Sequence, residues 1–200
     1  MVVGLDEKLA RFLDEVRSFG LNHDSRTEKR LNQMLNITPD TGLFLSILIQ
    51  SVGARRVLEV GTSNGYSTMW IADALRNTHG RVTTVEVSRR KIALAKRNFL
   101  KSGLSEYVDL YLGDIRAFLP RQADLSFDMI FMDAERPQYV LYWSELNRVL
   151  RRRGLLIADN ALSPRPHELD DFIGLLKASG RYIVQILRVG KGELVALKRG

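Results

Sequence analysis

Cysteine is absent from the 200-residue chain, so disulfide bonds and thiolate metal sites are excluded. Long hydrophobic runs are also missing, because the longest candidate, GLFLSILIQSVG, is shorter than the roughly 20 residues that a membrane-spanning helix needs. The amino-terminal stretch MVVGLDEKLARFLDEV is charged too early for a secretory signal peptide. We therefore expect a soluble protein with no membrane partner, and a cytoplasmic location by default.

Acidic residues are in the minority, since 23 Asp and Glu oppose 30 Lys and Arg and leave a net charge of +7. Such an excess favours an acidic partner such as RNA. The basic residues nevertheless occur in small groups spread along the chain, which is also typical of a solvated basic surface. These groups are Arg55–Arg56, Arg89–Lys91, Lys96–Arg97 and Arg151–Arg153. Both interpretations stay open, and tRNA is kept as a candidate partner.

The first 53 residues carry helical patterns. Apolar residues at helical spacing predict an amphipathic first helix; they are Leu5, Leu9, Phe12, Leu13 and Val16. SRTE is a capping box in which Ser25 is the N-cap and Glu28 reaches back, so a second helix is expected to run to about Asn36. TPD starts a third helix, which Thr38 caps and Gly53 ends.

Strand and helix patterns alternate from Arg55 onward, which predicts parallel strands joined by right-handed helical crossovers. The expected strands are RRVLEVG, RVTTVEV, YVDLYLG, FDMIFMD and GLLIADN, and the expected helices cover 66–77, 88–101, 115–119, 138–150 and 166–178. A β-hairpin is predicted at the end of the chain, where GKG is flanked by the strand-like runs RYIVQILRV and ELVALKR. The predicted fold is α/β, a doubly wound, mostly parallel seven-stranded Rossmann-like sheet with an antiparallel C-terminal hairpin. A single domain of residues 1–200 is expected, with helices in 1–53 and the core in 54–200.

The turn after the first strand has the spacing Glu59-x-Gly61-x-x-x-Gly65. A carboxylate at this point would repel the pyrophosphate of a dinucleotide, for which such turns are usually built. It suits a cofactor with positive charge and no phosphate, and S-adenosylmethionine has an ammonium and a sulfonium group. Gly61 and Gly65 permit close backbone approach, and Ser67 is placed to hydrogen-bond the methionine carboxylate.

Acidic residues also end the next two strands. Glu86 ends the second strand, where an acid can accept hydrogen bonds from both ribose hydroxyls, and Asp114 follows the third strand beside the expected adenine edge. Each alone could be a solvated loop acid. Three polar features at the carboxyl ends of consecutive strands favour a ligand along that edge.

A second polar group follows the fourth and fifth strands. Asp133, Asp159 and Asn160 would bring three oxygen ligands to one edge of the sheet, a set that suits Mg²⁺, Mn²⁺ or Ca²⁺ with water completing the shell. The alternative is that Asp159 and Asn160 only form an Asx turn.

From about Thr38 to the C-terminus the sequence resembles the cation-dependent class I O-methyltransferases, including catechol and caffeoyl-coenzyme A O-methyltransferases and bacterial relatives. The motifs that carry the resemblance are TPDTGLFL, VLEVGTSNGYST, VTTVEVS, GDIRAFLP, FDMIFMDAERPQY and GLLIADN. The resemblance implies that Glu59, Gly61, Ser67, Glu86 and Asp114 border S-adenosylmethionine. It also implies that Asp133, Asp159 and Asn160 hold the metal.

Two departures from the family pattern concern catalysis. The family has Asp-x-x-Lys-x-x-Tyr, with the lysine treated as general base, whereas this chain has Arg136 between Asp133 and Tyr139. Arginine keeps its proton near neutral pH, so the metal alone ionises the acceptor, or Arg136 stabilises the oxyanion, or Arg136 is a surface residue and activity is altered or lost. The short stretch ALSPRPHELDDF, where relatives often have a longer insertion, predicts an open mouth.

The expected activity is methylation of a hydroxyl on a catechol-like small molecule. A tRNA methyltransferase acting on a hydroxylated base and a non-catalytic cofactor-binding protein are the alternatives. Asp133 and Arg136 are the predicted catalytic residues, and a homodimer is expected. The predicted cofactor-binding residues are Thr38, Glu59, Gly61, Thr62, Ser63, Gly65, Ser67, Glu86, Asp114 and Asp133.

Overall fold

The computed structural model of the protein describes residues 5–200, so residues 1–4 of the predicted amino-terminal region lie outside it. The α-helices are α1 (Glu7–Asp24), α2 (Pro39–Ser51), α3 (Tyr66–Thr78), α4 (Arg89–Ser102), α5 (Ile115–Phe118), α6 (Tyr139–Val149) and α7 (Asp170–Ala178). The strands are β1 (Arg56–Val60), β2 (Arg81–Glu86), β3 (Val108–Leu112), β4 (Phe127–Met132), β5 (Leu150–Ala158), β6 (Tyr182–Leu187) and β7 (Glu193–Lys198).

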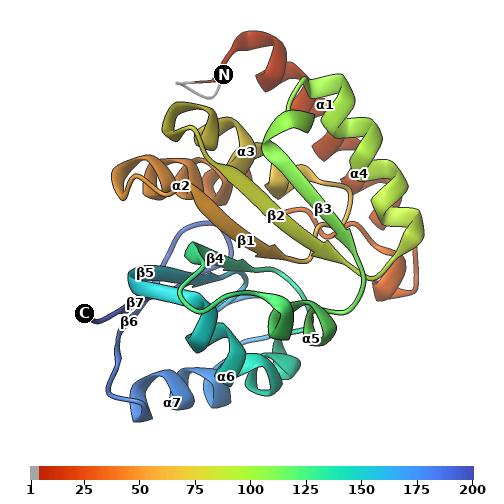
Figure 1. Ribbon diagram of the computed structural model, residues 1–200. Helices are drawn as coiled ribbons and strands as arrows, with labels where there is room; N and C mark the ends of the chain where they lie inside the picture. The colour runs from red at the N-terminus through yellow and green to blue at the C-terminus, as the bar shows by residue number, and fades with distance from the viewer. Residues whose placement is uncertain (1–4) are drawn as a thin grey trace.

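The strands form one seven-stranded sheet in the order β3-β2-β1-β4-β5-β7-β6. β1 to β5 pair in parallel, whereas β7 runs antiparallel to both β5 and β6. The arrowheads of β1, β2 and β3 all point to the same side of the molecule (Figure 1). The predicted fold class is confirmed; the assignment of residues 1–200 to a single domain stays a prediction.

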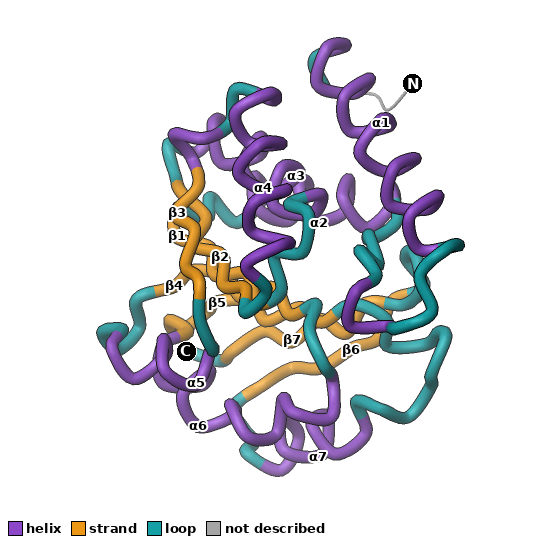
Figure 2. The backbone as a smooth tube through the Cα atoms, turned by 90° about the vertical axis from the view of Figure 1, so that its right-hand side faces the viewer, coloured by secondary structure: helices purple, strands orange, loops and turns teal. Residues whose placement is uncertain are grey.

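Alternate residues of the central strands face two separate apolar cores. Val57 of β1 and Phe131 of β4 face a core shared with α1–α4, and Leu58 and Ile130 face a second core shared with α5–α7. Figure 2 shows the sheet between these two groups of helices. Because both faces of the sheet are covered, polar side chains that act on a ligand belong at its edges, and above all at the carboxyl ends of the strands.

The helix predicted after Ser25 does not form. Ser25 instead caps the end of α1, and only one 3₁₀ turn follows, at Arg30–Asn32. The carboxylate of Asp24 accepts hydrogen bonds from the backbone N–H groups of Met34 (2.6 Å) and Leu35 (2.8 Å). These bonds fold the segment back onto the end of α1, which overrides the local capping pattern.

The third predicted helix is confirmed as α2. Its N-cap is Thr38, whose hydroxyl oxygen accepts a hydrogen bond from the N–H of Thr41 (3.1 Å). This helix contains the longest apolar run of the sequence. Across residues 5–200, however, neither α2 nor any other helix combines the length and the apolar character needed to cross a membrane.

The apolar face of α1 packs within its own chain. Leu9, Leu13 and Val16 are buried in the core that also contains α3 and α4. These residues therefore need no second subunit to cover them. The homodimer stays a prediction that this helix no longer supports.

Candidate active site

The carboxyl ends of β1 and β4 meet where the strand order reverses, which is the usual ligand-binding crevice of such sheets. The N–H of Asp133 donates to the carbonyl of Val60 (2.9 Å), and the N–H of Asp159 donates to the carbonyl of Met132 (3.1 Å). The loops after β1, β4 and β5 are thus joined directly. The structure therefore brings the predicted cofactor turn and the second acidic group together.

The glycines of the turn let its backbone approach other segments closely. Gly61 has φ +104°, and a Cβ there would overlap the carbonyl oxygen of Asp133. Gly65 has φ +84°, and a Cβ there would lie 2.5 Å from the ring of Phe99. Both positions have backbone angles that residues with a Cβ rarely adopt, so the predicted need for glycine has a structural reason.

Glu59 is fully buried near the end of β1, two residues before Gly61 of the turn. Its carboxylate accepts hydrogen bonds from the hydroxyls of Ser67 and Thr68 on α3 and of Thr84 on β2. These bonds tie β1 to both neighbouring elements. Contacts of Glu59 and Ser67 with the methionine end of the cofactor stay predictions.

Burial raises the pKa of Glu59 from 4.5 to about 7, although the three hydroxyls oppose the shift. Between these pH values the folded protein keeps a proton that the unfolded chain has lost. The associated stability is present below pH 4.5 and is lost as the pH rises through about 7. We expect this group to lower the free energy of unfolding by about 3 kcal/mol over that range.

Denaturant unfolding of the metal-free and cofactor-free protein between pH 5 and pH 8 measures this effect. Glu59→Gln removes the ionisation, so the difference in unfolding free energy between the variant and the parent should change with pH. A constant difference would contradict the assigned pKa.

The side chain of Glu86 links the cofactor turn to the start of α4. Its carboxylate accepts hydrogen bonds from the N–H groups of Ser63 (2.9 Å) and Ser88 (2.8 Å). The side chain holds both loops in place at the carboxyl end of β2. The predicted ribose contact would use the remaining lone pairs of the same oxygens.

Glu86→Ala is expected to weaken S-adenosylmethionine binding by about 1.5–3 kcal/mol, the scale of hydrogen bonds to a charged group. Glu86→Gln retains one carbonyl oxygen and should lose less. Titration calorimetry measures both values. An unchanged affinity in Glu86→Ala would remove the ribose assignment.

Two further predicted cofactor residues anchor the turn. The hydroxyl of Thr62 pairs with that of Thr84 (2.6 Å), and Thr62 is buried. The hydroxyl of Ser63 donates to the carbonyl of Met34 (2.7 Å). The irregular segment after α1 therefore rests on the cofactor turn, which sequence patterns did not indicate.

Asp114 lies at the predicted end of β3, but its carboxylate is engaged locally. It caps α5 by accepting a hydrogen bond from the N–H of Arg116 (2.8 Å), and it forms an ion pair with the same residue. The hydrogen bonds from Arg116 lower the pKa of Asp114. The N–H of Gly113 donates to the carbonyl of Glu86 (2.9 Å), which places Asp114 beside the predicted ribose residue.

The three predicted metal ligands lie on adjacent loops. Burial raises the pKa of Asp133 well above its usual value, and the neighbouring charge of Asp159 raises it further. Burial also raises the pKa of Asp159. Asn160 adopts φ +65°, a left-handed conformation that asparagine tolerates, and its amide N–H₂ donates to Asp159.

These residues fit a divalent cation by their chemistry. The buried carboxylate of Asp159 raises the pKa of the partly buried Asp133 beside it, an arrangement that a cation between them would stabilise, and all three side chains offer hard oxygen donors. Within residues 5–200, no group of three or more His, Cys, Asp or Glu could hold a metal. Two carboxylates and one amide oxygen would therefore need water or acceptor oxygens to complete the shell.

Arg136 is buried, with 3% of its surface exposed, so the interpretation as a surface residue is wrong. Its Nε donates to Glu168 (2.7 Å), and Glu168 also pairs with Arg165 (2.7 Å). The charge of Arg136 acts against the raised pKa values of Asp133 and Asp159. Arg136 therefore lies beside the acidic pair and is held there by the loop that follows β5.

That loop joins Asn160 to α7 without regular structure. Its residues 162–167 are exposed, and α7 begins at Asp170, four residues later than predicted. The open mouth stays a prediction.

Glu193 was missed by sequence reasoning. Ala158 of β5 pairs with Leu194 of β7, so the start of β7 lies beside Asp159. Glu193 is buried and accepts a hydrogen bond from the hydroxyl of Thr41 (2.8 Å). Burial, followed by the charge of Asp159, raises its pKa to about 10, so it is neutral at pH 7. A prediction that the second strand of the hairpin pairs with β5 would have placed Glu193 beside Asp159.

The aromatic side chains of Tyr139, Tyr142 and Trp143 pack into the protein core. Tyr139 is fully buried, and its hydroxyl accepts a hydrogen bond from the N–H of Ala134 (2.9 Å). Tyr142 is buried, and Trp143 packs edge-on against Phe172. These contacts give the three side chains a packing role.

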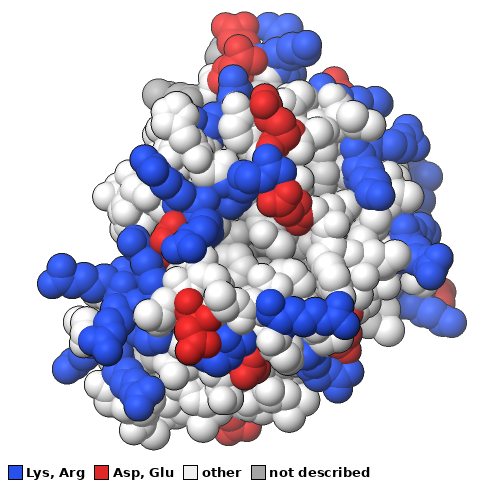
Figure 3. Space-filling model, in the orientation of Figure 1, with Lys and Arg blue, Asp and Glu red and all other residues white. Residues whose placement is uncertain are grey.

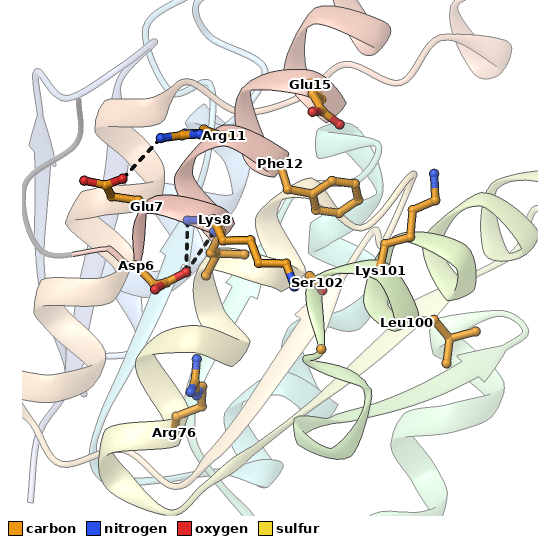
Figure 4. Close-up of a pocket in the computed structure, with 12 residues that line it drawn as sticks. Asp6, Glu7, Lys8, Arg11, Phe12, Glu15, Arg76, Leu100, Lys101 and Ser102 are labelled. Carbon is orange, nitrogen blue, oxygen red and sulfur yellow. Dashed lines mark hydrogen bonds and ion pairs between the residues drawn. The ribbon is translucent and has the colours of Figure 1, made fainter.

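One groove lies away from this site. It has a volume of about 720 Å³ and is lined by the first turns of α1 and the last turn of α4. Figure 4 shows Phe12 and Lys101 on its two sides. Because α4 runs back across the sheet, its last turn lies toward the amino ends of the strands, opposite the acidic pair.

A sequence profile of the O-methyltransferase family matches residues 10–165. A catechol O-methyltransferase from Niastella koreensis is 37% identical over 131 residues, which cover 64% of this chain and 59% of that protein. A second, from Mycobacterium tuberculosis, is 33% identical over 126 residues, which cover 63% and 57%. The chain thus matches less than two thirds of the length of these relatives.

Two solved structures are similar over the whole chain. The O-methyltransferase from Bacillus cereus in complex with S-adenosylhomocysteine is 26% identical, with a TM-score of 0.79 and coverage of 100% and 94%. TomG from Streptomyces achromogenes, in complex with S-adenosylmethionine, is 26% identical, with a TM-score of 0.78 and coverage of 100% and 93%. The fold is that of the Rossmann-like methyltransferases. The chain belongs to the O-methyltransferase family.

Proposed function

We propose that the protein is an S-adenosylmethionine-dependent O-methyltransferase that acts on a hydroxyl of a catechol-like small molecule with the help of a divalent cation. The observation that carries the proposal is the joining of the β1 turn to the acidic pair through Gly61 and Asp133. A methyl donor in the turn and an acceptor at the acidic pair would meet there.

The cation would be held by Asp133, Asp159 and Asn160. When bound, it lowers the pKa of a coordinated hydroxyl and fixes its direction. The backbone bonds of Asp133 and Asp159 to the ends of β1 and β4 hold both residues directly against the strands. Such anchoring maintains the near-attack geometry on which this type of displacement depends.

Arg136 supplies a fixed positive charge next to the acidic pair. It cannot act as general base, because its guanidinium stays protonated. It is suited to stabilise the negative charge of an ionised acceptor, and Glu168 orients it for that role.

Arg136→Lys is expected to keep or improve methyl transfer. A lysine can pair with Glu168, restores the residue of the family pattern, and has a pKa that burial can lower. Arg136→Met, which removes the charge, should slow the reaction. Steady-state rates of the three proteins check this order. Loss of transfer in Arg136→Lys with intact metal binding would show that the planar guanidinium is required.

One group of basic residues lies away from the candidate site. Lys and Arg gather on the side of the molecule where the C-terminus lies (Figure 3, left), and further groups lie along the opposite side (Figure 3, right). Arginines open β1 and β2, occupy the first half of β5 and flank the far ends of the hairpin strands, all at the amino edge of the parallel sheet. This edge is opposite the candidate site.

An acceptor panel tests the proposal. Labelled S-adenosylmethionine is incubated with catechols, with matched monophenols and with bulk tRNA. We expect label in the catechols only, because two adjacent oxygens are needed for chelation. Transfer to tRNA would support the alternative activity, and cofactor binding without transfer to any acceptor would support a non-catalytic protein.

A further inference from the structure

The turn between β6 and β7, residues 190–192, is fastened to the loop that follows the acidic pair. The N–H of Ala161 donates to the carbonyl of Gly192 (2.8 Å), and the N–H of Leu162 donates to the carbonyl of Lys191 (3.1 Å). These bonds follow directly on Asn160. They place the hairpin turn at the mouth of the candidate site.

Glycines on both sides of Lys191 allow this close fit. Gly190 has φ +54°, and a Cβ there would lie 2.6 Å from the hydroxyl oxygen of Thr38. Gly192 has φ +97°, and a Cβ there would lie 2.6 Å from the side chain of Leu162. The turn therefore packs between the start of α2 and the loop after β5. Of its residues 190–192, Lys191 alone has a side chain.

Lys191 is half-buried, and it forms no hydrogen bond or ion pair through its side chain with the residues that the structure describes. The backbone on either side of this side chain is bonded to Ala161 and Leu162, which directly follow the predicted metal ligands Asp159 and Asn160. Arg136 is occupied by Glu168, whereas Lys191 is left to meet a ligand.

We propose, on the basis of the proposed function, that Lys191 binds an anionic substituent of the acceptor, so that the acceptor is a dihydroxy-aromatic acid. A cation held by Asp133 and Asp159 would neutralise the acidic pair beside this turn. A neutral acceptor would leave its ammonium group half-buried without a partner. A carboxylate on the ring provides a charge-assisted hydrogen bond at that point.

Binding of a matched ligand pair tests this assignment without requiring turnover. The pair is 3,4-dihydroxybenzoate and its neutral isostere 3,4-dihydroxybenzamide, titrated calorimetrically into the magnesium- and S-adenosylhomocysteine-saturated protein; the 2,3-dihydroxy pair varies the position of the acid. The same pairs serve as acceptors, so that KM and kcat are separated.

The parent protein should bind the acid of at least one pair roughly tenfold more tightly than the amide, the scale of one hydrogen bond to a charged group. Lys191→Met should abolish this preference, Lys191→Glu should reverse it, and Lys191→Arg should restore most of it. Lys177→Met, on the exposed face of α7, is the matched control and should leave the preference unchanged.

A preference that survives in Lys191→Met, no preference in the parent for either pair, or no binding of either pair would overturn the assignment. Selective, Lys191-dependent binding without methylation of either ligand would support it while rejecting the proposed function. If Lys191→Met lost acid and amide binding equally, the turn would have a structural role, and the assignment of Lys191 to the anionic group would be overturned.

Discussion

Asp133→Asn and Asp159→Asn are each expected to lower methyl transfer on the order of a hundredfold or more. Each change removes one of the two carboxylates that would hold the cation, and the loss of metal affinity should exceed the 10–100-fold that even outer-shell changes cause. Without the cation, the acceptor hydroxyl would lose the group that lowers its pKa, and Arg136 offers no proton-accepting replacement. Rates at saturating cofactor and acceptor measure the effect.

Asparagine preserves the size of the side chain, so the two variants should fold. Because burial raises the pKa values of both acids, and the charge of Asp159 raises that of Asp133 further, removing one charge should stabilise the metal-free protein at pH 8. Asp171→Asn, at an exposed position in the first turn of α7, is the control for charge alone. Unchanged metal affinity and rate in both site variants would require another role for these acids.

Gly61→Ala is the second change with a large expected effect. The new Cβ would overlap the carbonyl oxygen of Asp133, and φ +104° is unfavourable for alanine. Strain and overpacking together should lower the free energy of unfolding by roughly 2–5 kcal/mol. Displacing the turn should also weaken S-adenosylmethionine binding. Denaturant unfolding and calorimetry measure the two quantities.

Gly174→Ala is the matched control, because a Cβ on this glycine of α7 would meet no atom within 4 Å. It should leave cofactor binding unchanged and stabilise the protein by about 0.5–1 kcal/mol, as expected in a helix interior. If Gly61→Ala behaved in the same way, the close contact between the β1 and β4 loops would not be needed.

The parallel sheet could be predicted because its signals are local. Each central strand is a short apolar run with a polar residue at or next to its end. Glu59, Glu86 and Asp133 all lie at or beside strand ends on one edge of the sheet. The N-cap at Thr38 was likewise a local signal. In these cases the residue type and its position along the chain were sufficient to predict where the residue lies in the fold.

The errors arose where distant contacts decide the structure. The capping box at Ser25 was overridden by hydrogen bonds from Met34 and Leu35 to Asp24, which no local pattern reveals. Burial of Arg136 depends on Glu168, which lies 32 residues away in an irregular loop. Glu193 reaches the site only because β7 inserts between β5 and β6, a consequence of strand order.

The most direct test of the central claim is methylation of a catechol acid by S-adenosylmethionine after EDTA treatment, with and without added Mg²⁺, followed by mass spectrometry of the product. The account predicts no product in EDTA and a monomethyl ether once Mg²⁺ is restored. Full methylation in EDTA would contradict the metal-assisted reaction.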